Sequence, residues 1–132
     1  VCMCGNVSCL ETVVSGIALE RLQAEAYPET PISQIFARHA HEAPLREFVD
    51  GMAQTVAAEV NLLDPDCIIL GGGLLQMAGF PQQQLEEGIH RFARKPWPEG
   101  NLDLRTSRPD QQNGPVGAAL YARARLADET YL

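Results

Sequence analysis

The fold is decided by one stretch of the chain, LLDPDCIILGGG at residues 62–73. A short apolar run, CIIL, lies between an Asp-Pro-Asp turn and three consecutive glycines. Such an uninterrupted run predicts a strand buried on both faces, as in a parallel sheet. The glycines that follow let a ligand approach the backbone, because no Cβ blocks it, and nucleotides bind at such strand ends. A tight strand-to-helix turn without a ligand stays open, since the pattern is neither GxGxxG nor a P-loop.

The segments on either side of this stretch predict helices and one further strand. Apolar residues at helical spacing predict helices over 10–26 (with a break at Ser15-Gly16), 32–40, 44–64, 80–95 and 115–127. Alternation with period two predicts a strand over 102–106. This order of elements indicates an α/β layer architecture. In the last helix, the expected core residues are Val116, Leu120, Tyr121 and Leu126, and close packing is expected at Gly114, Gly117 and Ala118.

Composition narrows the class of protein. The chain has 132 residues and a formal net charge of −7, from 10 basic and 17 acidic side chains. This length predicts one domain over residues 1–132, and the acidic charge disfavours a nucleic-acid surface, which needs clustered Lys and Arg. No apolar run approaches the roughly 20 residues of a membrane span. The chain begins without an initiator Met or a signal-peptide pattern. Its clustered cysteines resemble a metal site in a reducing compartment more than a disulfide framework, so a cytoplasmic protein is expected.

Three of the four cysteines lie in the segment CMCGNVSCLE at residues 2–11. Cys2, Cys4 and Cys9 can converge on one metal ion if a tight turn intervenes, and the Gly-Asn pair at residues 5–6 tolerates such a turn. A structural zinc site needs a fourth ligand, which comes from a distant part of the fold or from upstream of residue 1. The alternative is three unligated, reduced thiols. Cys67, inside the apolar run, is expected to be a small buried hydrophobic residue.

The cysteine segment resembles the signature of the ROK family of sugar kinases and sugar-responsive repressors. The family motif is Cys-x-Cys-Gly-x-x-Gly-Cys-x-Glu, preceded by a Gly-His whose histidine is the fourth zinc ligand. This sequence departs from the motif at Ser8 and begins after the position of the Gly-His. The glycines at 71–73 and the GxxGAA at 114–119 follow in family order. The LLDPD run before the first glycines is similar to the D-allose kinase branch.

This resemblance implies a fold and a set of site residues. The fold is the C-terminal α/β domain of a ribonuclease H-like, actin-like ATPase, with an N-terminal zinc-binding loop. Zinc is structural at Cys2, Cys4 and Cys9, and Gly71, Gly72 and Gly73 belong to the adenosine part of an ATP site. Glu11 binds sugar hydroxyls by resemblance; from its position alone, a negative charge near a helix N-terminus is the simpler reading.

The function that the resemblance implies is ATP-dependent transfer of the γ-phosphate to a hexose, with Mg²⁺ assisting and with allose as the favoured sugar. The other domain, with an Asp-x-Gly-Gly-Thr loop and the catalytic Asp, is expected upstream, since these residues contain no such loop. No catalytic residue is therefore assigned here, and this chain alone is expected to be inactive. Family members are oligomers, so a homo-oligomer is expected. The alternatives are the sugar-sensing domain of a ROK repressor, which would add a nucleic-acid partner, and a zinc-stabilised interaction module.

Overall fold

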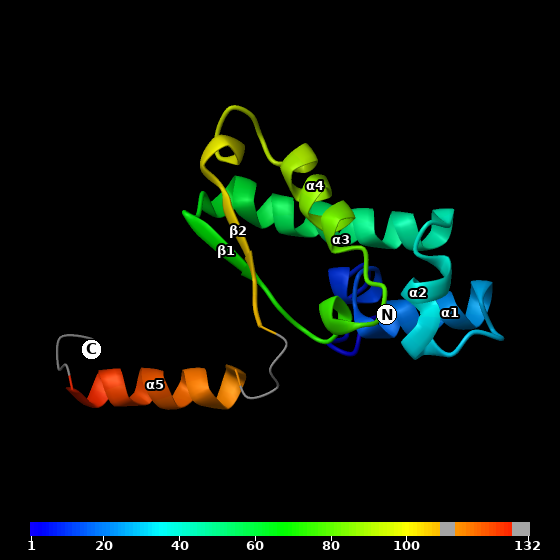
Figure 1. Cartoon of the computed structure of the whole chain (residues 1–132), viewed down its shortest axis with the longest axis horizontal. Coiled ribbons are helices and arrows are strands. Elements are labelled where there is room, and N and C mark those ends of the chain that lie inside the picture. The colour runs from blue at the N-terminus through cyan, green and yellow to red at the C-terminus, as the bar shows by residue number, and fades with distance from the viewer. Residues whose placement is uncertain (109–112, 128–132) are drawn as a thin grey trace.

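The computed structural model describes residues 1–108 and 113–127. Its principal elements are five α-helices and two β-strands: α1 (Gly16–Ala26), α2 (Ile35–His39), α3 (Ala43–Leu63), β1 (Cys67–Leu70), α4 (Gln82–Phe92), β2 (Asp103–Thr106) and α5 (Asn113–Ala127). Short 3-10 turns connect them, among them η1 (Leu10–Thr12) and η3 (Leu74–Gln76). None of the described helices is both long and apolar enough to cross a membrane. The predicted α/β order of elements is confirmed (Figure 1).

The longest helix, α3, forms where the sequence predicts it. Pro44 occupies the first turn, where its missing N–H costs nothing. Asp64 ends the helix in the left-handed conformation with φ of 47°, and Pro65 cannot continue it. The buried face of the helix comprises Leu45, Phe48, Val49, Ala53, Ala57 and Val60.

The two strands form a parallel pair, with Ile68 opposite Leu104 and Ile69 opposite Arg105. Helix α4 connects the strands and packs on α3, on the side of the sheet where Ile68, Leu70 and Leu104 join the core (Figure 1). The other side is open: Ile69 is 67% exposed. The prediction that this strand is buried on both faces is therefore wrong for this chain, because the helices cover only one face of the sheet.

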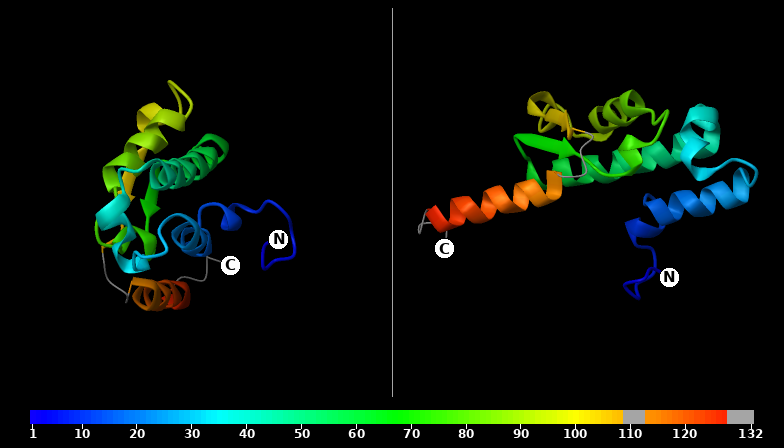
Figure 2. Two further views of the ribbon diagram at one scale, coloured as in Figure 1. Left: turned by 90° about the vertical axis from the view of Figure 1, so that its right-hand side faces the viewer. Right: turned by 60° about the horizontal axis from the view of Figure 1, so that its bottom comes forward.

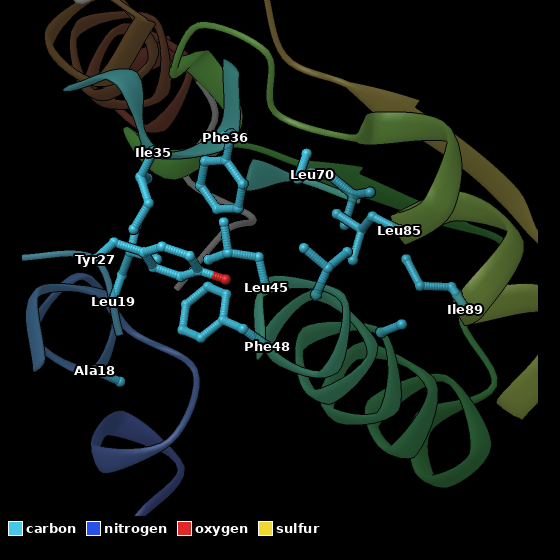
Figure 3. Close-up of a cluster of buried hydrophobic side chains, with 13 residues drawn as sticks. Ala18, Leu19, Tyr27, Ile35, Phe36, Leu45, Phe48, Leu70, Leu85 and Ile89 are labelled. Carbon is cyan, nitrogen blue, oxygen red and sulfur yellow. The ribbon is translucent and has the colours of Figure 1, made fainter. Parts of the chain in front are cut away.

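The first two helices close the other end of the core. Ser15 caps α1 by accepting a hydrogen bond from the backbone N–H of Ala18, which confirms the predicted break before Gly16. Of the remainder of the predicted helix, Leu10–Thr12 form η1 and residues 13–15 form a turn. Side chains from α1 and α2 meet those of α3 in one apolar cluster (Figure 3), whose labelled members at this end include Leu19, Ile35, Phe36, Leu45 and Phe48.

Helix α5 differs from the sequence-based expectation. It projects from the rest of the structure (Figures 1 and 2), and its expected core residues are exposed: Val116 by 49%, Leu120 by 50%, Tyr121 by 63% and Leu126 by 88%. In the described parts of the chain, a Cβ built on Gly114 or Gly117 would meet nothing within 4 Å beyond its chain neighbours and the nearby backbone of its own helix. The core assignment and the close packing are therefore wrong here. The apolar spacing formed a helix, but no described residue of α5 belongs to the buried apolar cluster.

A single glycine sets how closely α4 packs on α3. A Cβ built on Gly88 would lie 2.6 Å from the Cβ of Ala53, which is attached directly to the α3 backbone and cannot turn aside. We predict that Gly88→Ala lowers the free energy of unfolding by up to about 2 kcal/mol, since overpacking costs about 1–3 kcal/mol and alanine regains roughly 1 kcal/mol of helix propensity. Urea unfolding followed by circular dichroism measures the change. Gly117→Ala, on exposed α5, is the matched control and should be neutral or stabilising; equal effects of both variants would contradict the packing argument.

Candidate functional site

The three N-terminal cysteines lie together in the structure. The Sγ atoms of Cys2, Cys4 and Cys9 are all within 4.8 Å of one another, and those of Cys4 and Cys9 are 3.4 Å apart. All three are free thiols. Cys4 is exposed, whereas Cys2 and Cys9 are half-buried. The convergence that the spacing predicted is therefore present.

Two backbone positions with positive φ bring these thiols together. Gly5 has φ of 87° and Ser8 has φ of 61°. The backbone N–H of Cys2 donates to Asn6 O at 2.8 Å, and that of Gly5 donates to Cys2 O at 2.9 Å, which closes the predicted turn. A non-glycine residue pays roughly 1–2 kcal/mol in this region. Ser8 stands where the resembled motif has glycine, and its φ gives the physical reason for that preference.

The surroundings of Cys4 and Cys9 shift the pKa values of their two thiols in opposite directions. The backbone N–H of Asn6 lowers the pKa of the Cys4 thiol, and the hydrogen bond with Cys9 adds to this effect. The same Cys4–Cys9 contact is the largest cause of a raised pKa at Cys9. The two pKa shifts are opposite, so within this pair Cys4 is the thiol that ionises more readily. Thiolates, not thiols, bind metals.

The donor set fits zinc. Zinc binds thiolates at about 2.3 Å in a tetrahedron, so that bound sulfurs lie about 3.8 Å apart, close to the spacing found here. In the described residues, no histidine or carboxylate joins the three thiols in a metal-sized group. The imidazole of His39 is instead bonded to Thr30 and Glu42, and that of His90 to Glu99. The fourth ligand therefore stays a prediction.

Glu11 lies two residues beyond Cys9, in the first turn of η1. The backbone around it is held, since the Thr12 hydroxyl donates to Cys9 O at 2.6 Å and the Ser15 hydroxyl donates to Glu11 O. The Glu11 side chain is exposed. Within residues 1–108 and 113–127, its carboxylate has no hydrogen bond or ion pair, so it is available to a ligand.

The three glycines after β1 differ from one another. A Cβ on Gly71 would lie 2.8 Å from the Ser107 hydroxyl, so this glycine permits close packing of the two strand ends. Gly72 has φ of 127°, and a Cβ on Gly72 or Gly73 would meet no described atom within 4 Å. Gly72 lines a hollow of about 150 Å³ with Leu75, Gln76, Gln82, Thr106 and Ser107.

This hollow lies where the two parallel strands end. Gly72 follows β1, and Ser107 follows β2 and donates its backbone N–H to Leu70 O at 2.8 Å. Gln82, at the start of α4, donates to the Thr106 hydroxyl. Open parallel sheets bind ligands at this edge. The sequence pattern indicates the glycines but not Gln82, Thr106 and Ser107. The signal for these three is their place at the end of the second strand, directly after it, and at the start of the crossover helix. Glu11 is not among the residues that line this hollow.

Comparison with known proteins identifies the family. The sequence profile of the ROK family matches residues 1–125. The chain therefore belongs to the ROK family.

Two relatives are named as sugar kinases. An N-acetyl-D-glucosamine kinase of Yersinia pseudotuberculosis is 30% identical, over 72% of this chain and 34% of that protein. A glucokinase of Thermotoga maritima is 25% identical, over 95% of this chain and 45% of that protein. The chain thus spans less than half the length of these relatives.

Solved structures of two kinds resemble the chain. A ROK hexokinase from Thermus thermophilus matches with a TM-score of 0.74 and 27% identity, over 97% of this chain and 45% of that one. A ROK family transcriptional regulator, described as a homologue of the E. coli MLC protein, matches with a TM-score of 0.66 and 29% identity. That match covers 93% of this chain and 35% of the regulator.

The sulfur cluster predicts a metal stoichiometry. We expect the full-length protein to hold about one zinc ion per chain and Cys4→Ser to lose most of it, because a structural site tolerates no missing thiolate. Elemental analysis of purified protein measures the metal. Cys67→Ser, which removes the half-buried thiol of β1, is the control and should retain the zinc. Equal zinc content in both variants would contradict a site at the N-terminal loop.

Proposed function

We propose that this member of the ROK family is the C-terminal part of an ATP-dependent hexose kinase, which transfers the γ-phosphate of ATP to a sugar hydroxyl. The observation that carries the proposal is the hollow beside Gly72, at the carboxyl ends of two parallel strands. Such a hollow supports a nucleotide-binding role in a chain whose relatives are named as sugar kinases. The domain has, on this proposal, the ribonuclease H-like, actin-like fold.

The adenosine part of ATP is assigned to the backbone of Gly72 and Gly73, which follows β1. Gly72 and Gly73 leave the backbone uncovered, so a flat base or a ribose can lie against it. Gly71 supports them by letting Ser107 approach. The polar groups of Gln76 and Gln82 at the same hollow offer hydrogen-bonding partners for the ligand.

The sugar is assigned to Glu11, and the zinc to Cys2, Cys4 and Cys9. A carboxylate can accept two hydroxyl hydrogen bonds at once, and such bonds are selective when the carboxylate is held rigidly. Bound zinc would fix the loop that precedes Glu11, without a part in phosphoryl transfer. Bound ATP with Mg²⁺ supplies the phosphoryl group. The base that accepts the sugar proton is expected outside residues 1–132, as is the phosphate loop.

The sugar itself needs an experiment. The LLDPD run at 62–66 favours allose, whereas the relatives are named for N-acetyl-D-glucosamine and for glucose. One carboxylate cannot separate epimers, since both present neighbouring hydroxyls. The proposal is therefore a hexose kinase, with these three sugars as first substrates to test. A homo-oligomer in the cytoplasm remains the expectation for the whole protein.

A second candidate is the sugar-sensing domain of a transcriptional regulator. The specific observation in its favour is the match to the ROK regulator structure, at 29% identity. Such a protein would keep the zinc loop and Glu11 and would add a DNA-binding domain elsewhere. It would bind a sugar without turning it over.

Coupled ADP release from the full-length protein tests the kinase proposal. We expect turnover on at least one of allose, glucose and N-acetylglucosamine. The 132-residue chain alone should show none, because phosphoryl transfer needs groups from several loops at once. A zinc-loaded, folded protein that binds a sugar without turnover would favour the regulator. Turnover by the isolated chain would refute the proposal that phosphoryl transfer needs groups outside residues 1–132.

Replacing Glu11 tests the sugar assignment. Hydrogen bonds to a charged group contribute about 1.5–3 kcal/mol, so Glu11→Ala should raise the KM for the sugar roughly 10- to 100-fold. Glu11→Gln should lie between, and the KM for ATP should not change. Glu20→Ala removes an exposed carboxylate from α1 and is the matched control. Steady-state kinetics measure all three variants; a sugar KM unaffected by Glu11→Ala would move the sugar site elsewhere.

A further inference from the structure

We propose that Cys4 and Cys9 are an oxidation site: a hydroperoxide converts them to a disulfide, and the loop then releases its metal. The proposal rests on the zinc role proposed above for these thiols and adds a modification to the same loop. Its basis is the arrangement of sulfurs, in which Cys4 and Cys9 are in direct contact at 3.4 Å.

The geometry selects one pair among the three thiols. A disulfide bond is about 2.05 Å long, so the two sulfurs need to approach by roughly 1.4 Å, which side-chain rotation can supply. The Cys2 sulfur lies within 4.8 Å of both, whereas the 3.4 Å contact joins Cys4 to Cys9. The turn through Gly5 and Ser8 already brings residues 4 and 9 face to face. Cys67 is not a member of this cluster.

The loop is open to an oxidant and separate from the core. Cys4 is exposed, and its neighbours Met3 and Val7 are 91% and 75% exposed. The N-terminal loop projects from the helices (Figure 2), and the buried apolar cluster has no member before Ala18. A peroxide can therefore reach Cys4, and the loop can change shape while the core stays packed.

The reaction balances with one hydroperoxide per disulfide. The Cys4 thiolate attacks a peroxide oxygen; an S–O bond forms, the O–O bond breaks, and the leaving oxygen takes a proton to become water when the oxidant is hydrogen peroxide. The Cys9 thiolate then leaves the metal and attacks the Cys4 sulfenic acid; the S–S bond forms, the S–O bond breaks, and the leaving hydroxide takes a proton from solvent to become the second water. The two sulfurs lose two electrons in total, and the peroxide is reduced to two waters.

The disulfide removes two of the three thiolates that this chain offers to a metal. Cys2 and the expected fourth ligand are only two of the four ligands that a structural zinc site needs, so the metal dissociates. Glu11, two residues beyond Cys9, then loses the rigid loop that positions it. Oxidation would thus weaken sugar binding reversibly, because thiol reductants reopen disulfides.

The test treats the zinc-loaded, full-length protein with hydrogen peroxide in the presence of a chromogenic zinc chelator. We expect zinc release to follow the loss of two thiols per metal, and dithiothreitol with added zinc to restore both. The remaining thiols are then alkylated and the protein digested with trypsin. One tryptic peptide, ending at Arg21, contains all three cysteines. In the oxidised peptide, only Cys2 should carry the alkyl group. Apart from that group, the mass of the peptide should be about 2 Da below the mass of the reduced peptide. Fragmentation should give no backbone cleavage products between residues 4 and 9.

Variants keep the outcomes distinct. The Cys2→Ser variant retains Cys4 and Cys9 and should still form the disulfide between them. Cys9→Ser should not form it, and Cys67→Ser should behave as the parent protein. A disulfide that includes Cys2 would overturn the proposal, as would sulfinic acid at Cys4 without a disulfide to Cys9. So would zinc release without thiol loss. Kinase activity of the untreated, reduced protein is measured separately, so that failure of the kinase proposal and failure of the oxidation proposal give different results.

Discussion

Burial against α3 is the constraint on which the rest of the chain depends. One end of its apolar face, with Leu45 and Phe48, receives the side chains of α1 and α2. The other end, with Ala53, receives α4 at a distance that only a glycine at position 88 permits. Because α4 is also the connection between the two strands, its fit on α3 decides where β1 and β2 end. The hollow beside Gly72 is placed by this chain of contacts.

Polar bonds fix the register of the same two helices. The Asn61 side chain accepts from the backbone N–H of Arg94 at 2.7 Å and so joins α3 to the segment after α4. Gln84 donates to Arg46 O at 3.0 Å near the other end of the contact. Arg91 and Asp50 add an ion pair at 3.0 Å whose partners are both partly exposed, and such pairs contribute little. Apolar packing therefore supplies most of the stability, and the hydrogen bonds of the Asn61 and Gln84 side chains select one alignment of α4 on α3.

The parts of this arrangement that sequence could predict are those set by local chemistry. Pro44 and Pro65 bound α3, Ser15 caps α1, and the Gly-Asn pair at 5–6 turns the cysteine loop; each acts within a few residues of itself. Ile69 and the apolar residues of α5 were misjudged because apolar spacing identifies a face but not the partner that covers it. Thr106 and Ser107 were missed for a related reason. Their meaning comes from the parallel pairing with residues 67–70, which no single segment of the sequence displays.

The cysteine loop, residues 1–9, is held by far fewer contacts than the core. The core holds its shape through buried contacts, whereas residues 1–9 contribute none of the buried side chains. Two backbone hydrogen bonds within residues 2–6 and one thiol contact are a weak restraint against the roughly 1–2 kcal/mol of backbone entropy that each ordered residue costs. Ser8, held at positive φ, adds to this cost. A carboxylate at position 11 can be selective only if the preceding loop is rigid, and the three converging thiols are the feature through which a metal could make it so. The same few atoms thus decide both the order of the loop and its sensitivity to oxidation.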